Sequence, residues 1–193
     1  MKPFLESGPY VAIDFETSAR SGACACAVGM VRLENQQIVD RFYSLIRPGY
    51  RKICYTNVHG LTWEMLKSER SFKEVWPDML AFIRGAKYLI AHNARFDRAV
   101  LNSNCDAYGI APPRLGFLCT LAGARKALKL PGYGLEAVSA YFQIELEHHH
   151  AESDAAACGQ IHCRLQQLKL ADKAMLLPPV KSGPARASRG REE

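Results

Sequence analysis

No stretch of the sequence is apolar over the roughly 18 residues that a membrane-spanning helix requires. Glu6 and Asp14 interrupt the N-terminal region before a long apolar core could follow its basic start, so no secretory signal is expected. The sequence also contains no internal repeat. At 193 residues with 48% hydrophobic content, it predicts one globular domain in the cytoplasm, with no membrane partner.

The seven cysteines lack the arrangement of a disulfide framework, because their number is odd and their spacing is irregular. Such usage is typical of reduced intracellular thiols. Cys24 and Cys26 form the one close pair that could suggest a metal, but no second pair with zinc-finger spacing follows. We therefore expect both to be small buried side chains rather than zinc ligands.

Acidic residues are outnumbered by basic ones, and the formal net charge is +6. Residues 180–193 hold four basic and two acidic side chains, so +2 lies there and +4 in the rest of the chain. A basic body favours a polyanionic partner such as nucleic acid, although the same excess is common on solvated surfaces. From Pro178 the composition turns to Pro, Gly, Ser, Ala and Arg, so we expect a folded domain over residues 1–177 and a disordered basic tail over 178–193.

The order of the expected elements predicts an α/β fold. Apolar runs indicate a strand at 10–15 and two more at 25–33 and 37–46, joined by a turn at "ENQ". Helical patterns then alternate with two short strands, at 87–93 and 115–120. Two of the expected helices begin at Thr62 and Ser71, and four more cover 95–109, 121–130, 135–142 and 151–170. This order indicates a mixed sheet of about five strands, an antiparallel meander followed by parallel strands, flanked by helices.

Two carboxylates end the first apolar strand, at Asp14 and Glu16. Side chains two residues apart on a strand point to the same face, so both acids project together while Val11, Ile13 and Phe15 occupy the other face. Burying two like charges side by side is costly, because each raises the pKa of the other and both lose hydration. Either Lys or Arg side chains at a rim, or bound cations, must balance them.

Further polar groups follow at two later points of the chain. Asp97 begins a helix after a short strand, where an acid is also favoured simply by the helix dipole. Asp154 lies one turn into the last helix, and His149 precedes it by five residues. That spacing places His149 on the loop before the helix, free to move over Asp154. A histidine triplet can equally be an exposed polar run.

Together, Asp14 and Glu16 in "DFET", Asp97 in "AHNARFD", and His149 with Asp154 in "HHAESDA" resemble the DEDDh family of 3′–5′ exonucleases. Within it, the chain looks most like the exonuclease domain of the epsilon proofreading subunit of bacterial replicative DNA polymerase and its free-standing relatives. The resemblance covers residues 9–168 and implies a ribonuclease H-like fold. It further implies that the four carboxylates hold two divalent cations, Mg²⁺ or Mn²⁺, and that His149 takes a proton from the attacking water. His149 is preferred to His148 and His150 because its spacing to Asp154 matches the family.

The resemblance also implies candidate substrate contacts. In relatives, the residues after the strand acids and the "HG" segment line the pocket for the terminal nucleotide; the corresponding residues are Thr17, Ser18, His59 and Leu61. Asn93 and Phe96 are expected to brace the site. Core packing is the alternative for Leu61 and Phe96, and a loop hydrogen bond for His59.

The function expected from the resemblance is hydrolysis at the 3′ end of DNA, single-stranded or frayed, with release of nucleoside 5′-monophosphates. One alternative within the same chemistry is RNA, as in related oligoribonucleases. Another is a nucleic-acid-binding subunit of a polymerase or repair assembly. The complete set of five site residues favours an active enzyme.

Overall fold

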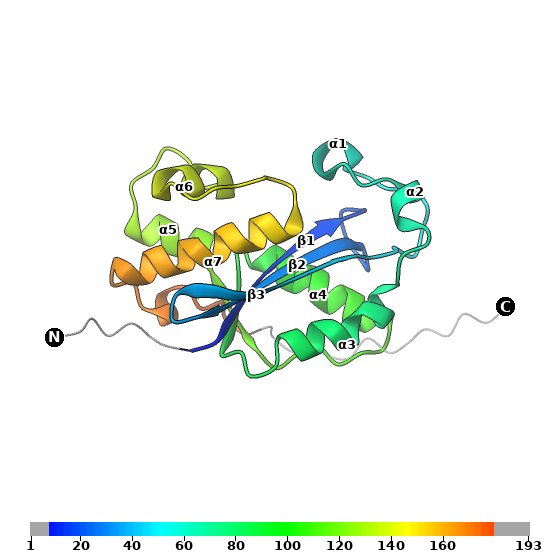
Figure 1. Cartoon of the computed structure of the whole chain (residues 1–193), viewed down its shortest axis with the longest axis horizontal. Helices are drawn as coiled ribbons and strands as arrows, with labels where there is room; N and C mark the ends of the chain where they lie inside the picture. The colour runs from blue at the N-terminus through cyan, green and yellow to red at the C-terminus, as the bar shows by residue number, and fades with distance from the viewer. Residues whose placement is uncertain (1–7, 180–193) are drawn as a thin grey trace.

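The computed structural model describes residues 8–179, so the expected tail lies outside the described residues from 180 onward. A five-stranded sheet forms the centre, in the order β3-β2-β1-β4-β5. Its strands are β1 (Tyr10–Thr17), β2 (Ala25–Glu34), β3 (Gln37–Leu45), β4 (Tyr88–Ala91) and β5 (Gly116–Cys119). Figure 1 shows helices packed on both faces of this sheet.

The predicted mixed sheet is confirmed. β1, β2 and β3 pair antiparallel, whereas β4 pairs parallel to both β1 and β5. The turn between β2 and β3 consists of Asn35 and Gln36, both with positive φ, as a tight two-residue hairpin requires. β1 is therefore a central strand; β2 pairs with it along its whole length, whereas β4 pairs only with its first half, Tyr10 to Ala12.

The helices follow the predicted order, with local differences. They are α1 (Thr56–His59), α2 (Trp63–Leu66), α3 (Phe72–Phe82), α4 (Arg95–Ala107), α5 (Thr120–Ala127), α6 (Leu135–Phe142) and α7 (Ala151–Gln167), followed by the 3₁₀ helix η1 (Asp172–Ala174). Thr62 caps α2, and Ser71 forms the predicted capping box with Glu74 at the start of α3. The sequence did not predict α1.

The last helix is shorter than predicted, ending at Gln167 rather than Leu170. Lys169 adopts a left-handed backbone with φ 64°. The backbone N–H of Leu170 then donates to the Leu165 carbonyl at 3.1 Å, and that of Lys169 to the Gln166 carbonyl at 2.8 Å. This pair of hydrogen bonds is the Schellman arrangement, which satisfies the last carbonyls and turns the chain away from the helix.

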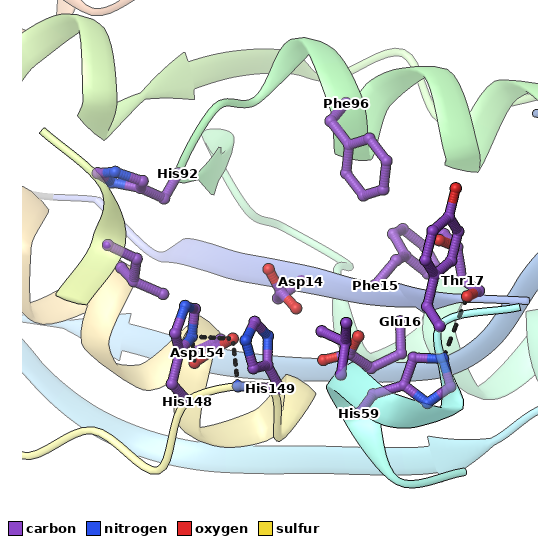
Figure 2. Close-up of a pocket in the computed structure, with 13 residues that line it drawn as sticks. Asp14, Phe15, Glu16, Thr17, His59, His92, Phe96, His148, His149 and Asp154 are labelled. Carbon is purple, nitrogen blue, oxygen red and sulfur yellow. Dashed lines mark hydrogen bonds and ion pairs between the residues drawn. The ribbon is translucent and has the colours of Figure 1, made fainter. Parts of the chain in front are cut away.

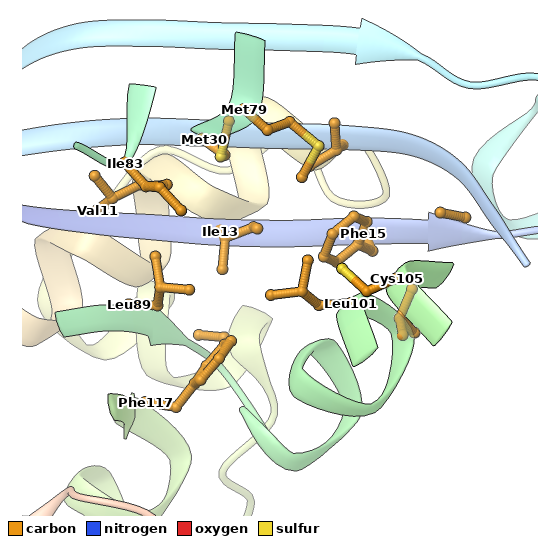
Figure 3. Packing of buried hydrophobic residues seen from close by; sticks show 14 of the residues in the cluster. Val11, Ile13, Phe15, Met30, Met79, Ile83, Leu89, Leu101, Cys105 and Phe117 are labelled. Carbon is orange, nitrogen blue, oxygen red and sulfur yellow. The ribbon is translucent and has the colours of Figure 1, made fainter. Parts of the chain in front are cut away.

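The alternation of side chains along β1 divides the core into two layers. Val11, Ile13 and Phe15 pack on the face covered by α3 and α4, where Met79 and Leu101 meet them (Figure 3). The other face carries Tyr10 and Ala12 under α5, α6 and α7. Asp14 and Glu16 share the parity of Ala12, as predicted, and so project toward α7.

Cys24 and Cys26 are buried with free thiols, in agreement with the reading of both as small apolar side chains. The helices within residues 8–179 are all too short or too polar to cross a bilayer.

The 3₁₀ helix η1 is tied to the core by a buried polar network. The Asp172 carboxylate accepts hydrogen bonds from the Tyr10 hydroxyl at 2.7 Å and from the Gln166 amide at 3.0 Å, and lies 3.0 Å from Nε2 of His162. These bonds join η1 to the first residue of β1 and to the second half of α7. The network therefore lies at the opposite end of β1 from Asp14 and Glu16.

Candidate active site

Three carboxylates meet beside the end of β1. Oxygen atoms of Asp14, Glu16 and Asp154 all lie within 4.8 Å of one another, although Asp154 is far from the other two in sequence. Figure 2 shows Asp14 and Glu16 projecting from the strand toward Asp154 on α7. Carboxylate oxygens at such separations are suited to holding a hard divalent cation.

Gly29 explains how α7 comes so close to the sheet. It pairs with Asp14 across the ladder between β1 and β2. A Cβ atom at this position would lie 2.2 Å from the backbone of Ala151 and Glu152, which begin α7. Only glycine permits this approach of helix to strand, and the approach places Asp154, in the first turn of α7, against Asp14.

Asp97 adds a fourth carboxylate from the first turn of α4. Its side chain is 1% exposed, and its Oδ1 has no hydrogen-bond partner among residues 8–179. Burial is the main cause that raises its pKa, to about 8. Asp97 in turn contributes to raising the pKa of Asp14, so the two charges act on each other. An acid that served only to complement the helix dipole would be exposed to water, whereas Asp97 is buried.

The pKa values of the other three acids are displaced in the same direction. Burial, followed by the charges of Asp97, Asp154 and Glu16, raises the pKa of Asp14 well above its ordinary range. Burial and the charge of Asp154 raise the pKa of Glu16 to about 7. Burial also raises the pKa of Asp154. None of the four forms an ion pair with Lys or Arg within the described part of the chain, so the alternative of rim carboxylates tied to basic side chains is not supported.

The three consecutive histidines have different surroundings. Nδ1 of His148 lies 3.1 Å from one oxygen of Asp154 and 3.3 Å from the other. His149 lies on the loop before α7 with φ 69°, donates its backbone N–H to Asp154 at 3.1 Å, and stacks its ring on that of His148. His150 stacks instead on Tyr43. The predicted position of His149 on the loop is therefore correct, and His148 is a second imidazole at the same carboxylate.

Asp14, Glu16 and Asp154 open into a cavity of about 250 Å³ together with His148 and His149, whereas Asp97 is buried and does not line it. It is lined by residues from β1, α1, the start of α4, α6 and the loop before α7: Asp14, Phe15, Glu16, Thr17, Tyr55, Val58, His59, His92, Phe96, Leu135, His148, His149 and Asp154. Of the predicted substrate contacts, Thr17, His59 and Phe96 are among them. Phe96 is 43% exposed, so it is a cavity wall rather than core. His59 also makes the loop hydrogen bond considered as its alternative, with Nε2 3.2 Å from the Thr17 carbonyl.

The remaining predicted contacts do not line this cavity. Ser18 is fully buried and its N–H donates to the Cys24 carbonyl at 2.8 Å. The N–H of Leu61 donates to Nδ1 of His59 at 3.0 Å, and its side chain packs with Cys26 in a small apolar cluster. Backbone donors at Ser18 and Leu61 are thus already engaged within the protein. Asn93 is exposed, with φ 65°, at the turn that leads into α4.

Sequence reasoning missed several lining residues. His92 bridges two segments, with Nδ1 2.9 Å from the Thr120 hydroxyl and Nε2 2.8 Å from the Tyr133 carbonyl. Its position directly after β4, five residues before Asp97, could have identified it as a candidate site residue. Tyr55 and Val58 had none, because no pattern in the sequence predicted α1.

Comparisons with known proteins agree with this geometry. The sequence model of an exonuclease family, named for RNase T, matches residues 11–162. Among curated relatives, the DNA polymerase III PolC-type of Thermotoga petrophila is 31% identical over 169 residues, and that of Thermotoga maritima 32% over 164. These alignments cover 85% and 82% of this chain but only 12% of each polymerase.

Solved structures share the fold. Exonuclease X in complex with 5′ overhanging duplex DNA matches with a TM-score of 0.69 and 20% identity, over 86% of this chain and 96% of that one. The nuclease domain of 3′hExo, described as a DEDDh family member and bound to rAMP, matches with a TM-score of 0.74 and 17% identity, over 89% and 96%. The family match over residues 11–162 agrees with the family that the sequence motifs resemble: the chain belongs to the exonuclease family.

Proposed function

We propose that the chain is a metal-dependent exonuclease that removes nucleotides from the 3′ end of single-stranded or frayed DNA and releases nucleoside 5′-monophosphates. One observation carries the proposal. Three carboxylates, Asp14, Glu16 and Asp154, line one cavity, and the buried Asp97 lies close enough to raise the pKa of Asp14; all four have raised pKa values and no Lys or Arg partner in residues 8–179. Such a cluster is costly unless cations balance it.

Two divalent cations fit the donor set. All four side chains offer hard oxygen ligands of the kind that Mg²⁺ and Mn²⁺ prefer, and Oδ1 of Asp97 is buried without a partner among the described residues. Asp14, Glu16 and Asp154 would hold one ion, and Asp97 with Asp14 the other. When bound, two such ions stabilise the attacking and the leaving oxygen of a phosphodiester displacement.

The chain's own side chains would perform the remaining tasks. His149 is suited to accept the proton of the attacking water, because it lies on a loop beside Asp154 and no hydrogen bond to its ring occurs within residues 8–179. His148 would hold Asp154 in place from the other side. Thr17, His59 and Phe96 would receive the terminal nucleotide, with the Phe96 ring available to stack on its base.

DNA is the favoured substrate because the relatives in sequence are DNA polymerases of the PolC type. RNA is a second candidate, since one structural neighbour is a 3′-exonuclease that recognises a histone mRNA stem-loop. We also propose that the chain acts within a polymerase or repair assembly, because it corresponds to about one eighth of its relatives, the PolC-type polymerases.

The test is a time course on a 5′-labelled single-stranded DNA oligonucleotide beside its RNA counterpart, with Mg²⁺, with Mn²⁺ and with chelator. We expect a metal-dependent ladder that shortens by one nucleotide at a time from the 3′ end, faster on DNA. Asp14→Ala and Asp154→Ala should abolish it, whereas Asp106→Ala, an exposed acid on α4, should not. Normal cleavage by either site variant would refute the metal assignment, and the lack of any ladder would refute the function.

A further inference from the structure

Two loops form a continuous rim at the end of β1, beside the cavity. The loop of residues 18–24 follows β1, and the loop of residues 46–55 precedes α1. The Cys54 N–H donates to the Ser18 carbonyl at 2.8 Å, and the hydroxyls of Ser18 and Tyr50 are hydrogen-bonded at 3.3 Å. Figure 1 shows α1 and α2 at this same end of the sheet. The two loops are therefore one surface, and Tyr55 joins it to the cavity wall.

This surface carries positive charge that nothing in the described chain neutralises. Arg20, Arg51 and Lys52 are exposed, and none of them makes an ion pair within residues 8–179. Neither loop contains an Asp or a Glu. Two nearby basic residues differ: Arg47, at the start of the second loop, is paired with Glu74, and Arg70, outside both loops, is paired with Asp78. An unpaired group of like charges favours a polyanion.

Two tyrosines lie among these charges. Tyr50 and Tyr55 are each 37% exposed, so part of each ring is open to solvent. Tyr55 has a left-handed backbone with φ 65°, and its carbonyl accepts from the N–H groups of Val58 and His59. A non-glycine residue in this conformation is held there by its surroundings, at a cost on the order of 1 kcal/mol. The residue that bears this conformational cost, Tyr55, also lines the cavity.

A second surface near the site has the opposite charge. A groove of about 510 Å³ beside the histidine loop is lined by Glu145, Glu147 and Glu152 and by one Arg, Arg41, which is paired with Glu152. In Figure 2, His148 and Thr17 lie to either side of Asp14. The acidic groove includes Glu147, which adjoins His148 in the chain, and the basic rim begins directly after Thr17. A phosphate chain leaving the cavity is repelled on the first side and attracted on the second.

We propose that Arg20, Tyr50, Arg51, Lys52 and Tyr55, here called the lip, bind the nucleotides immediately upstream of the 3′-terminal one in a single-stranded substrate. The three cations contact phosphates, and the two rings stack with unpaired bases, which is the general mode of single-strand binding. The inference rests on the proposed function, since it extends the same site along the rest of the strand.

The test compares two substrates. A single-stranded DNA 12-mer reaches the lip, whereas thymidine 5′-(p-nitrophenyl phosphate) has one nucleotide and fills the cavity alone. For the triple variant Arg20→Gln, Arg51→Gln, Lys52→Gln we expect a loss of about tenfold or more in kcat/KM on the 12-mer, and retained turnover of the small substrate. The slope of log affinity against log salt should fall by about 2, from three lost phosphate contacts on a single strand.

The matched control removes three other exposed basic side chains that make no ion pair within residues 8–179, through Lys73→Gln, Arg84→Gln and Arg114→Gln. It changes the net charge equally, so a long-range effect of charge would lower the rate of both triple variants alike. Equal losses, or no loss in the lip variant, would overturn the proposal. Binding of the 12-mer measured by fluorescence anisotropy in chelator decides the matter even without turnover: lip-dependent binding without cleavage refutes the proposed function but keeps the lip.

Tyr50 provides a second test that leaves the charge unchanged. Tyr50→Phe and Tyr50→Ala both lose the hydrogen bond to Ser18, but only phenylalanine retains a stacking ring. We expect Tyr50→Phe to bind the 12-mer like the wild type and Tyr50→Ala to bind about tenfold more weakly, since stacking of one base contributes about 1–3 kcal/mol. Equal binding by the two variants would show that the ring does not stack.

Discussion

Nδ1 of His148 lies 3.1 Å from the Asp154 carboxylate, which is also held by the backbone N–H of the next residue. Two adjacent histidines thus contact the same acid in different ways, His148 through its ring and His149 through its backbone N–H. The imidazole of His148 is engaged with Asp154, whereas no hydrogen bond to the ring of His149 occurs within residues 8–179. Within the described residues, both ring nitrogens of His149 are thus available to a water molecule in the cavity, whereas His148 has only Nε2 available.

Exchanging these two histidines for alanine should therefore have different effects. His149→Ala should keep the fold and lower kcat by about 10²–10⁴, the usual contribution of a general base. His148→Ala should instead weaken the affinity for Mg²⁺ or Mn²⁺ about 10–100-fold, because Asp154 loses the group that orients it. Metal titrations of kcat and the pH–rate profile separate the two. An unchanged profile in His149→Ala would assign the base role to another residue.

The acid cluster predicts a stability that falls with rising pH in the absence of metal. Glu16 has a folded-state pKa of about 7 against an ordinary 4.5, and Asp97 one of about 8 against 3.8. Because these pKa values are raised, the stabilisation is fully present below about pH 4 and is lost as the pH rises through 7 to 8. In chelator, we expect the free energy of unfolding to fall by at least about 1.4 kcal/mol between pH 5.5 and 8.5, the equivalent of one pKa unit.

Urea denaturation at several pH values measures this trend. Added Mg²⁺ or Mn²⁺ should flatten it, since cations balance the ionised carboxylates. Asp97→Asn should also make the pH dependence of stability weaker, because asparagine has the shape of aspartate but carries no charge. A stability in chelator that does not change over this range would contradict the idea that the cluster is strained by its own charge.

Gly29 is predicted to be intolerant of even one added methyl group. In Gly29→Ala the new Cβ would meet the backbone of Ala151 and Glu152 at 2.2 Å, so α7 must move away from β2. Overpacking of this kind typically costs about 1–3 kcal/mol, and the displaced helix carries Asp154 away from Asp14. We expect a lowered melting temperature together with a loss of turnover and of metal affinity.

Gly132→Ala is a suitable control for Gly29→Ala, because a Cβ at Gly132 would meet nothing within 4 Å. Its melting temperature and turnover should match those of the wild type. A Gly29→Ala variant that is fully active would mean that α7 can shift without disturbing the acids.

The Asp172 network should affect stability without affecting chemistry. Burial opposes ionisation of this carboxyl, but hydrogen bonds from His162 and Tyr10 outweigh it and hold its pKa well below the usual range. A lowered pKa stabilises the fold above about pH 4, and this stabilisation is lost as the pH falls further. Asp172→Asn should cost about 1.5–3 kcal/mol at neutral pH, measured by urea denaturation, with kcat on the 12-mer unchanged at 25 °C. A parallel drop in kcat would show that the network couples to the site.

Much of this protein follows from local patterns in the sequence. The alternation of "YVAIDFE" determined which face of β1 bears the acids, because side chains of a strand alternate whatever surrounds it. The cap at Thr62 and the capping box at Ser71 located two helix starts, since both act within one turn. The order of "DFET", "AHNARFD" and "HHAESDA" identified the family.

Other features depended on contacts between distant residues and were decided only by the tertiary structure. The approach of α7 to Gly29 joins Asp154 to Asp14, and no local pattern reports it. The same holds for the unexpected α1 with Tyr55, for the engaged backbone donors of Ser18 and Leu61, and for the pairing of His148 with Asp154. Sequence periodicity reflects which face of an element is buried, whereas distances between side chains of different elements follow from how closely those elements pack.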